Sequence, residues 1–168
     1  DEPCRILDHI EGLADLFGLD SVPVGLWPSF ADPRVDALIT MASGWTMAFS
    51  PEGYANISMP SLTMMGTGDD PFLTARQPYT EISSSQKALV AFEGAGHTIY
   101  GNCPPAFVEG GFPFCFDPAW EMDRAHELIK HLSVAFLLDV LKGDTDAHSA
   151  MAPDAVTFEG ITVEAEGF

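Results

Sequence analysis

Three short runs of almost continuously apolar residues are separated by polar and glycine-rich segments along the chain. The runs occupy residues 35–42, 60–65 and 87–92, and each has the length and composition of a strand. Because polar residues hardly interrupt them, we expect the strands to be covered by helices on both faces, as parallel strands usually are. The pattern therefore predicts an α/β fold with a parallel sheet.

Two further segments have apolar residues at helical spacing. One is residues 5–17, and the other is a longer stripe within residues 117–142. The longer segment starts with Asp117-Pro118, a favourable N-cap followed by proline at the first helical position. Gly143 follows its last turn and is typical of a helix C-terminus. We therefore expect a long helix that begins after Asp117 and ends before Gly143.

The rest of the chain has weaker patterns. Residues 72–85 favour a helix, although Pro78 weakens this prediction, and residues 144–168 form an acidic tail with a loose pattern. No internal repeat is visible, so residues 1–168 are interpreted as a single, partial domain. Three parallel strands would leave two open sheet edges, and for this reason we expect part of the sheet to lie outside these residues.

The composition fits a folded domain with a strong negative charge. Apolar residues make up 46% and charged residues 19% of the 168 residues, which is enough apolar material for a core. The formal net charge of -18 repels phosphate backbones and anionic lipid. No apolar run is long enough to cross a bilayer. We therefore expect no nucleic-acid partner and no membrane span.

The three cysteines differ in their surroundings. Cys103 and Cys115 bracket a stretch rich in glycine and proline, whereas Cys4 stands alone near the start. A disulfide would stabilise a loop that has few other means of support, although three buried thiols are the simple alternative. We favour a Cys103–Cys115 disulfide and with it an oxidising compartment, either secreted or periplasmic.

Titratable side chains follow two of the predicted strands. Asp69 and Asp70 come after the second strand and a glycine turn, and His97 comes after the third strand. Catalytic groups of parallel sheets gather at the carboxyl ends of the strands. A histidine oriented by a carboxylate is the acid–base half of a nucleophilic triad, and the order acid then histidine is that of α/β-hydrolases. A helix cap and an ordinary loop histidine are the alternatives, but the joint placement favours catalysis.

Other candidate site residues are few. Trp45 follows the first strand and is the candidate for substrate binding, with a place in the core as the alternative. His126 and His131 are five positions apart, so they do not share a helix face well enough to bind zinc together. The sequence implies no metal and no organic cofactor.

Three segments of the chain resemble a known family. They are MPSLTMMGTGDDPF, KALVAFEGAGHTIYGNCPP and FDPAWEMDRAHELIKHLSVAFLLDVLKGD, and the resemblance extends over most of residues 33–143. They look like the carboxyl-terminal half of the α/β-hydrolases described as predicted dienelactone hydrolases, which are similar to platelet-activating-factor acetylhydrolases and polyester hydrolases. The resemblance implies that Asp69 is the triad acid, with neighbouring Asp70 as the alternative, that His97 is the triad base, and that the substrate is a small ester or a polyester.

The nucleophile of that family lies in a Gly-x-Ser-x-Gly motif, and no such pentapeptide occurs here. The resemblance implies that the chain begins just after the nucleophile helix. The serine and much of the sheet would then belong to a partner, an N-terminal hydrolase half, linked to Cys4 by a disulfide. A serine-type carboxylic-ester hydrolase is the function we favour. An amidase or peptidase with the same triad, and a non-catalytic scaffold or binding subunit, stay open.

Overall fold

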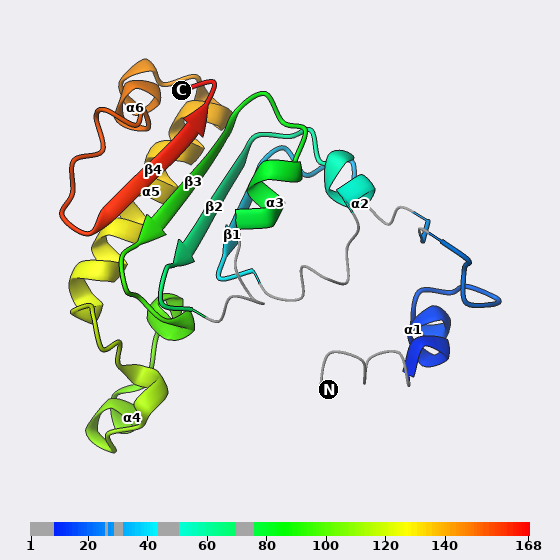
Figure 1. Cartoon of the computed structure of the whole chain (residues 1–168), viewed down its shortest axis with the longest axis horizontal. Coiled ribbons are helices and arrows are strands. Elements are labelled where there is room, and N and C mark those ends of the chain that lie inside the picture. Colours follow the sequence, from blue (N-terminus) through cyan, green and yellow to red (C-terminus); the bar gives the residue numbers. More distant parts are fainter. Residues whose placement is uncertain (1–8, 26, 29–31, 44–50, 70–75) are drawn as a thin grey trace. The chain divides into compact units, whose positions relative to one another are not determined.

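The computed structural model divides the chain into two compact units, residues 1–33 and 34–168 (Figure 1). The residues that the structure describes are 9–25, 27–28, 32–43, 51–69 and 76–168. The first unit holds helix α1 (Ile10–Leu16), which lies within the helix predicted at residues 5–17. The ring of Phe17, just after this helix, makes an edge contact with Trp27 at 6.1 Å between centroids.

Four strands form one sheet in the second unit (Figure 1). They are, in spatial order, β1 (Leu38–Met41), β2 (Ser61–Gly66), β3 (Lys87–Phe92) and β4 (Ile161–Glu166). The first three strands are parallel, and β4 pairs with β3 in the antiparallel direction. The three predicted strands are confirmed, and the fold is α/β with a mostly parallel sheet flanked by helices.

Strand β4 corrects two expectations. The tail at residues 144–168 contains a regular strand, and the outer edge of β3 is covered rather than open. Exposed Thr162, Glu164 and Glu166 alternate with buried or half-buried apolar residues, so the strand has the period-two pattern of a half-solvated edge. Arg76 fixes this edge by donating two hydrogen bonds, of 2.6 and 3.0 Å, to the Glu164 carboxylate.

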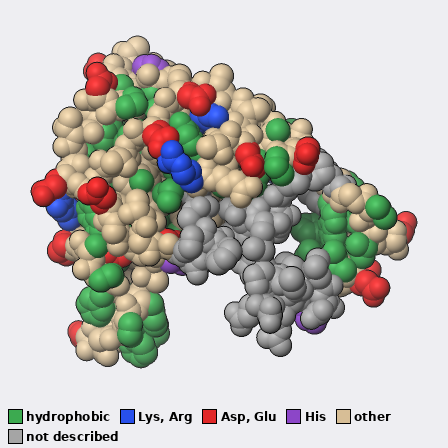
Figure 2. Space-filling model, viewed as in Figure 1, with side chains coloured by type: hydrophobic (Ala, Val, Ile, Leu, Met, Phe, Trp, Pro, Cys, Tyr) green, Lys and Arg blue, Asp and Glu red, His purple; other side chains and the backbone are tan. Residues whose placement is uncertain are grey.

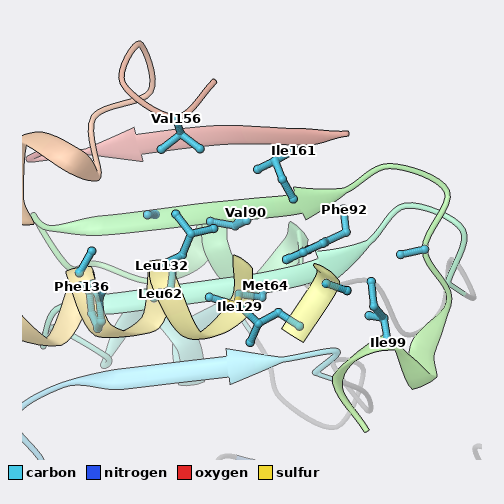
Figure 3. Packing of buried hydrophobic residues seen from close by; sticks show 14 of the residues in the cluster. Leu62, Met64, Val90, Phe92, Ile99, Ile129, Leu132, Phe136, Val156 and Ile161 are labelled. Atoms are coloured by element: carbon cyan, nitrogen blue, oxygen red, sulfur yellow. The ribbon is translucent and has the colours of Figure 1, made fainter. Parts of the chain in front are cut away.

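The core lies between the sheet and helix α5 (Met122–Lys142), as Figure 3 shows. Alternate positions of β2 and β3 contribute Leu62, Met64, Ala88, Val90 and Phe92. From α5 come Ile129, Leu132 and Phe136. Helix α3 (Arg76–Glu81) lies on the opposite face of the sheet (Figure 1). Coverage of both faces explains why the strands are almost continuously apolar.

The weak helix expected within residues 72–85 is confirmed as α3, with Pro78 at its third position. A proline is tolerated there because the N–H groups of the first turn have no partner within the helix. Tyr79 and Pro78 are buried in the contact with the sheet.

Helix α5 does not begin where the sequence predicts. Asp117 is not its N-cap; Glu121 is, and its carboxylate accepts hydrogen bonds from the backbone N–H groups of Asp123 and Arg124. Oδ1 of Asp117 accepts hydrogen bonds from the N–H groups of Ala119 and Trp120 in a turn before the helix, and the helix starts after a second cap, four residues later. The predicted end is confirmed: Gly143 takes a left-handed conformation, with φ 67°.

Short elements complete the second unit. They are α2 (Pro51–Ala55), η4 (His97–Tyr100), α4 (Pro105–Glu109), η5 (Pro113–Cys115) and α6 (Thr145–Ala150). A disulfide joins Cys103 to Cys115, as predicted, and closes the segment that holds α4 and η5. Within the described ranges, no helix combines the length and apolar composition that a membrane crossing needs.

Candidate functional site

The side chains of Asp69 and His97 meet beyond the carboxyl ends of β2 and β3. The Oδ2 atom of Asp69 lies 2.9 Å from Nδ1 of His97, across 28 positions of sequence. The side chain of Asp69 is 6% exposed, whereas that of His97 is 52% exposed. The two residues that the sequence singled out are therefore in contact, and the carboxylate is buried while the imidazole is half exposed.

Two turns without bulky side chains allow this contact. The N–H of Gly68 donates to the carbonyl of Ala95 at 2.9 Å, and the N–H of Gly94 donates to the hydroxyl of Thr67 at 2.8 Å. A Cβ on Gly66 would overlap the backbone oxygen of Ala95, and a Cβ on Gly68 would lie 2.5 Å from that of Gly94. The glycines after β2 are thus required for the close approach of the turn after β3.

Asp117 holds the turn that carries the histidine. Its Oδ2 accepts a 2.7 Å hydrogen bond from the N–H of Gly96, the residue before His97. Its Oδ1 accepts from the N–H groups of Ala119 and Trp120, at 2.9 and 3.1 Å. One carboxylate therefore ties the β3 turn to the segment that leads into α5. The local sequence around Asp117 favours a helix cap and does not indicate this contact, because the partner amide is 21 positions away.

The 3-10 helix η4 is anchored from two sides. Nε2 of His126, on α5, lies 3.1 Å from the carbonyl oxygen of Ile99, and the ring of Tyr100 packs edge-on against Phe92 at 5.9 Å between centroids. The hydroxyl of Tyr100 is buried and has no hydrogen-bond partner in the described part of the chain. Burial, and then the negative charge of Asp69, raise the pKa of this phenol far above its ordinary value, so Tyr100 stays neutral.

The geometry at His97 suits proton transfer. A proton on Nδ1 is donated to the Asp69 carboxylate, and this orients the ring and leaves Nε2 available for another partner. No protein hydrogen bond to Nε2 is present among the described residues. An imidazole in this arrangement can take a proton from a hydroxyl and give it back to a leaving group.

Three residues singled out from the sequence lie outside the described residues: Cys4, Trp45 and Asp70. The described ranges contain no group of three or more His, Cys, Asp or Glu side chains that could hold a metal ion. The site that the structure describes is therefore the Asp69–His97 pair with the turns that position it.

No protein-family model matches this sequence, and no curated protein matches it. The function is therefore inferred from the residues and their geometry.

Proposed function

We propose that this chain supplies the acid–base pair of a serine-type carboxylic-ester hydrolase. The observation that carries the proposal is the 2.9 Å contact between buried Asp69 and exposed His97 at the carboxyl edge of a parallel sheet. Asp117 supports it, because a carboxylate bound to the turn of the histidine fixes the backbone from which the imidazole projects. A carboxylate that only capped a loop would not need to contact a histidine whose own turn is held by a second carboxylate.

Each side chain has a defined role in the proposed reaction. Nε2 of His97 takes the proton from a serine hydroxyl as the serine oxygen attacks the ester carbonyl. The same nitrogen then gives the proton to the departing alcohol, and the acyl group is left on the serine. A water molecule, activated by His97 in the same way, releases the acid. Asp69 holds the ring orientation and stabilises the imidazolium throughout, without becoming protonated itself.

The serine is proposed to lie outside residues 1–168, because these residues contain no Gly-x-Ser-x-Gly motif. In the described part of the sheet, β1 has a strand neighbour on one side only, which is β2. The open side of β1 is where a parallel strand from the nucleophile-bearing polypeptide would add to the sheet. A disulfide from Cys4 to that polypeptide stays a prediction.

The Cys103–Cys115 disulfide supports the proposed compartment. Such bonds persist where the surroundings are oxidising, so we place the protein outside the cytoplasm, either secreted or in a periplasm. The substrate class proposed is a small ester or a polyester.

A fluorophosphonate probe, which labels activated serines, tests the function. The natural polypeptide that contains residues 1–168 is purified without reductant, together with whatever is bound to it, and treated with the probe. We expect a labelled serine outside residues 1–168, and labelling that falls by several orders of magnitude in His97→Ala and Asp69→Ala. The control is His131→Ala, which removes an exposed imidazole on α5 that contacts Phe158.

The non-catalytic scaffold is the second candidate, and the missing nucleophile motif favours it. An intact natural complex that shows no labelled serine would support the scaffold and contradict the hydrolase. Labelling that is equally strong in His97→Ala would also contradict the proposed role of the pair.

A further inference from the structure

Three phenylalanine rings form a cluster on the surface of the disulfide-closed segment. The rings of Phe107, Phe112 and Phe114 lie 4.9, 5.9 and 5.6 Å apart between centroids, so each contacts the other two. Each side chain nevertheless remains 43% to 49% exposed. We call these three residues the aromatic tip. Figure 2 shows hydrophobic side chains gathered at the end of the second unit where Figure 1 labels α4.

In the described part of the chain, the rings of the aromatic tip make ring contacts only with one another. A cleft of about 580 Å³ separates this segment from the start of α5, and residues such as Val108, Trp120 and His126 line it. None of the three rings is among the described residues that line this cleft. Clustered apolar surface in contact with water is unfavourable, and such a patch is typical of an interaction site.

The segment is built to hold the rings outward. The Cys103–Cys115 disulfide closes it at its base, and Gly111, with φ +67°, makes the tight turn between Phe107 and Phe112. The N–H of Phe112 donates to the carbonyl of Phe107 at 3.1 Å, which joins the two sides of that turn. The tip is therefore a closed, convex feature rather than a loose loop.

The tip lies next to the candidate site in the chain. Helix η4 begins at His97 and ends at Tyr100, and the segment opens at Cys103, three residues later. In Figure 1, α4 projects beyond η4, at the end of the sheet where β2 and β3 finish. The aromatic tip and the Asp69–His97 pair therefore lie at the same end of the sheet.

The charges around the tip restrict what can bind there. Glu109 is the only charged residue between Cys103 and Cys115, and the chain as a whole has a formal net charge of -18. An anionic surface would be repelled, and so would a second copy of the same chain. A convex aromatic feature also cannot enclose a single small molecule, because such ligands need a concave pocket. An extended apolar surface without net charge fits all of these conditions.

We propose that the aromatic tip inserts into the surface of an assembled ester lipid without net charge. This inference rests on the proposed hydrolase function, since it makes the lipid the substrate that the tip presents to His97. The phenylalanine rings enter the apolar layer, as aromatic and aliphatic side chains of interfacial segments do. Glu109 and the acidic body of the protein stay in water.

Insertion is recorded as a binding signal rather than as turnover, in a monolayer of dicaprin, an uncharged diacylglycerol. The full chain is injected beneath the monolayer, and the rise in surface pressure is recorded at several starting pressures. We expect clear insertion of the unmodified chain and a loss of roughly half or more of the pressure rise in F107S/F112S/F114S. The matched control, V134S/L138S/L141S, removes three similarly exposed apolar side chains from α5 and is expected to insert normally.

Two further variants keep the test decisive. Phe114→Ser changes only the most exposed ring of the tip, and is used if the triple variant fails to fold or loses the disulfide. His97→Ala is expected to insert like the unmodified chain, so a failed hydrolase proposal is distinguished from a failed docking proposal.

Three results would overturn the docking proposal. One is equal insertion of the unmodified chain and of both tip variants. Another is stronger insertion into a monolayer of anionic phosphatidylglycerol than into dicaprin. The third is self-association of the chain in sedimentation experiments that F107S/F112S/F114S abolishes, because it would assign the tip to a contact between copies.

Discussion

Asp117 binds the backbone N–H of Gly96 through a 2.7 Å hydrogen bond that spans 21 positions of sequence. This contact joins the turn after β3 to the entry of α5, and Gly96 immediately precedes His97. The orientation of the candidate catalytic histidine therefore depends on a carboxylate that does not touch it. Asp117 is a positioning residue in this interpretation.

Asp117→Ala is expected to destabilise the fold and to loosen the Asp69–His97 contact. The change removes three hydrogen bonds from backbone amides to a charged acceptor, so the free energy of unfolding should fall by about 2–4 kcal/mol. Urea denaturation measures this loss. The downfield proton of Nδ1 of His97, observed by NMR, reports the contact and should exchange faster in the variant.

The control for Asp117 is Asp154→Ala, which removes an exposed carboxylate from the tail. We expect it to change the free energy of unfolding by no more than about 0.5 kcal/mol. If Asp117→Ala left the His97 proton unchanged while lowering stability, Asp117 would be a structural residue only.

Gly66→Ala tests the close approach of the two turns. Its Cβ would overlap the backbone oxygen of Ala95, and a backbone atom cannot rotate away as a flexible side chain can. We expect the free energy of unfolding, measured by urea denaturation, to fall by about 3 kcal/mol or more, and Asp69 to separate from His97. Gly12→Ala is the matched control, because a Cβ there meets nothing within 4 Å, and it should be neutral or stabilising.

The pH dependence of stability should report the cap of α5. Hydrogen bonds from the N–H groups of Arg124 and then Asp123 lower the pKa of Glu121 below its ordinary value of 4.5. A lowered pKa in the folded state stabilises the fold above the pKa of the unfolded chain, and this stabilisation disappears as pH falls through the lower, folded value. The unmodified chain should therefore have a larger free energy of unfolding than Glu121→Gln. This difference should be greatest well above pH 4.5 and should shrink below that pH.

Unfolding curves at neutral and acidic pH measure this difference. Glu127→Gln removes the same charge from an exposed position on the same helix and serves as the control. It should have a smaller effect than Glu121→Gln at neutral pH, since no cap is lost. If the difference in free energy of unfolding between the unmodified chain and Glu121→Gln grew as the pH fell, the assignment of the cap would be wrong.

Much of the sheet could be predicted because its strands are marked locally. Residues 88–92 are buried, so this part of the run is continuously apolar and stands out from its neighbours. The contact between Asp69 and His97 could also be anticipated, since both follow parallel strands and such strands end at one edge. These predictions required nothing beyond the order of residues within each segment.

Features that depend on distant partners could not be predicted in this way. Strand β4 carries glutamates at its exposed positions, and their cationic partners, Arg76 and Lys87, are far away in the sequence. The role of Asp117 was hidden for the same reason, because an Asp-Pro pair before a helical stripe is also a good local cap. The local sequence favours Asp117 as a cap of α5, whereas in the folded chain its Oδ2 binds the N–H of Gly96.

The Cys103–Cys115 disulfide should stabilise the fold and the aromatic tip together. The bond closes a segment with a sequence separation of 12, for which the chain-entropy model gives about 3 kcal/mol. We expect C103S/C115S to lose about 2–3 kcal/mol in urea denaturation without reductant. Amide exchange within residues 103–115 should accelerate far more than exchange in β2 and β3, because those strands are held by the core on α5. A loss below about 1 kcal/mol, with unchanged exchange in the segment, would mean that the ring contacts alone hold the tip in place.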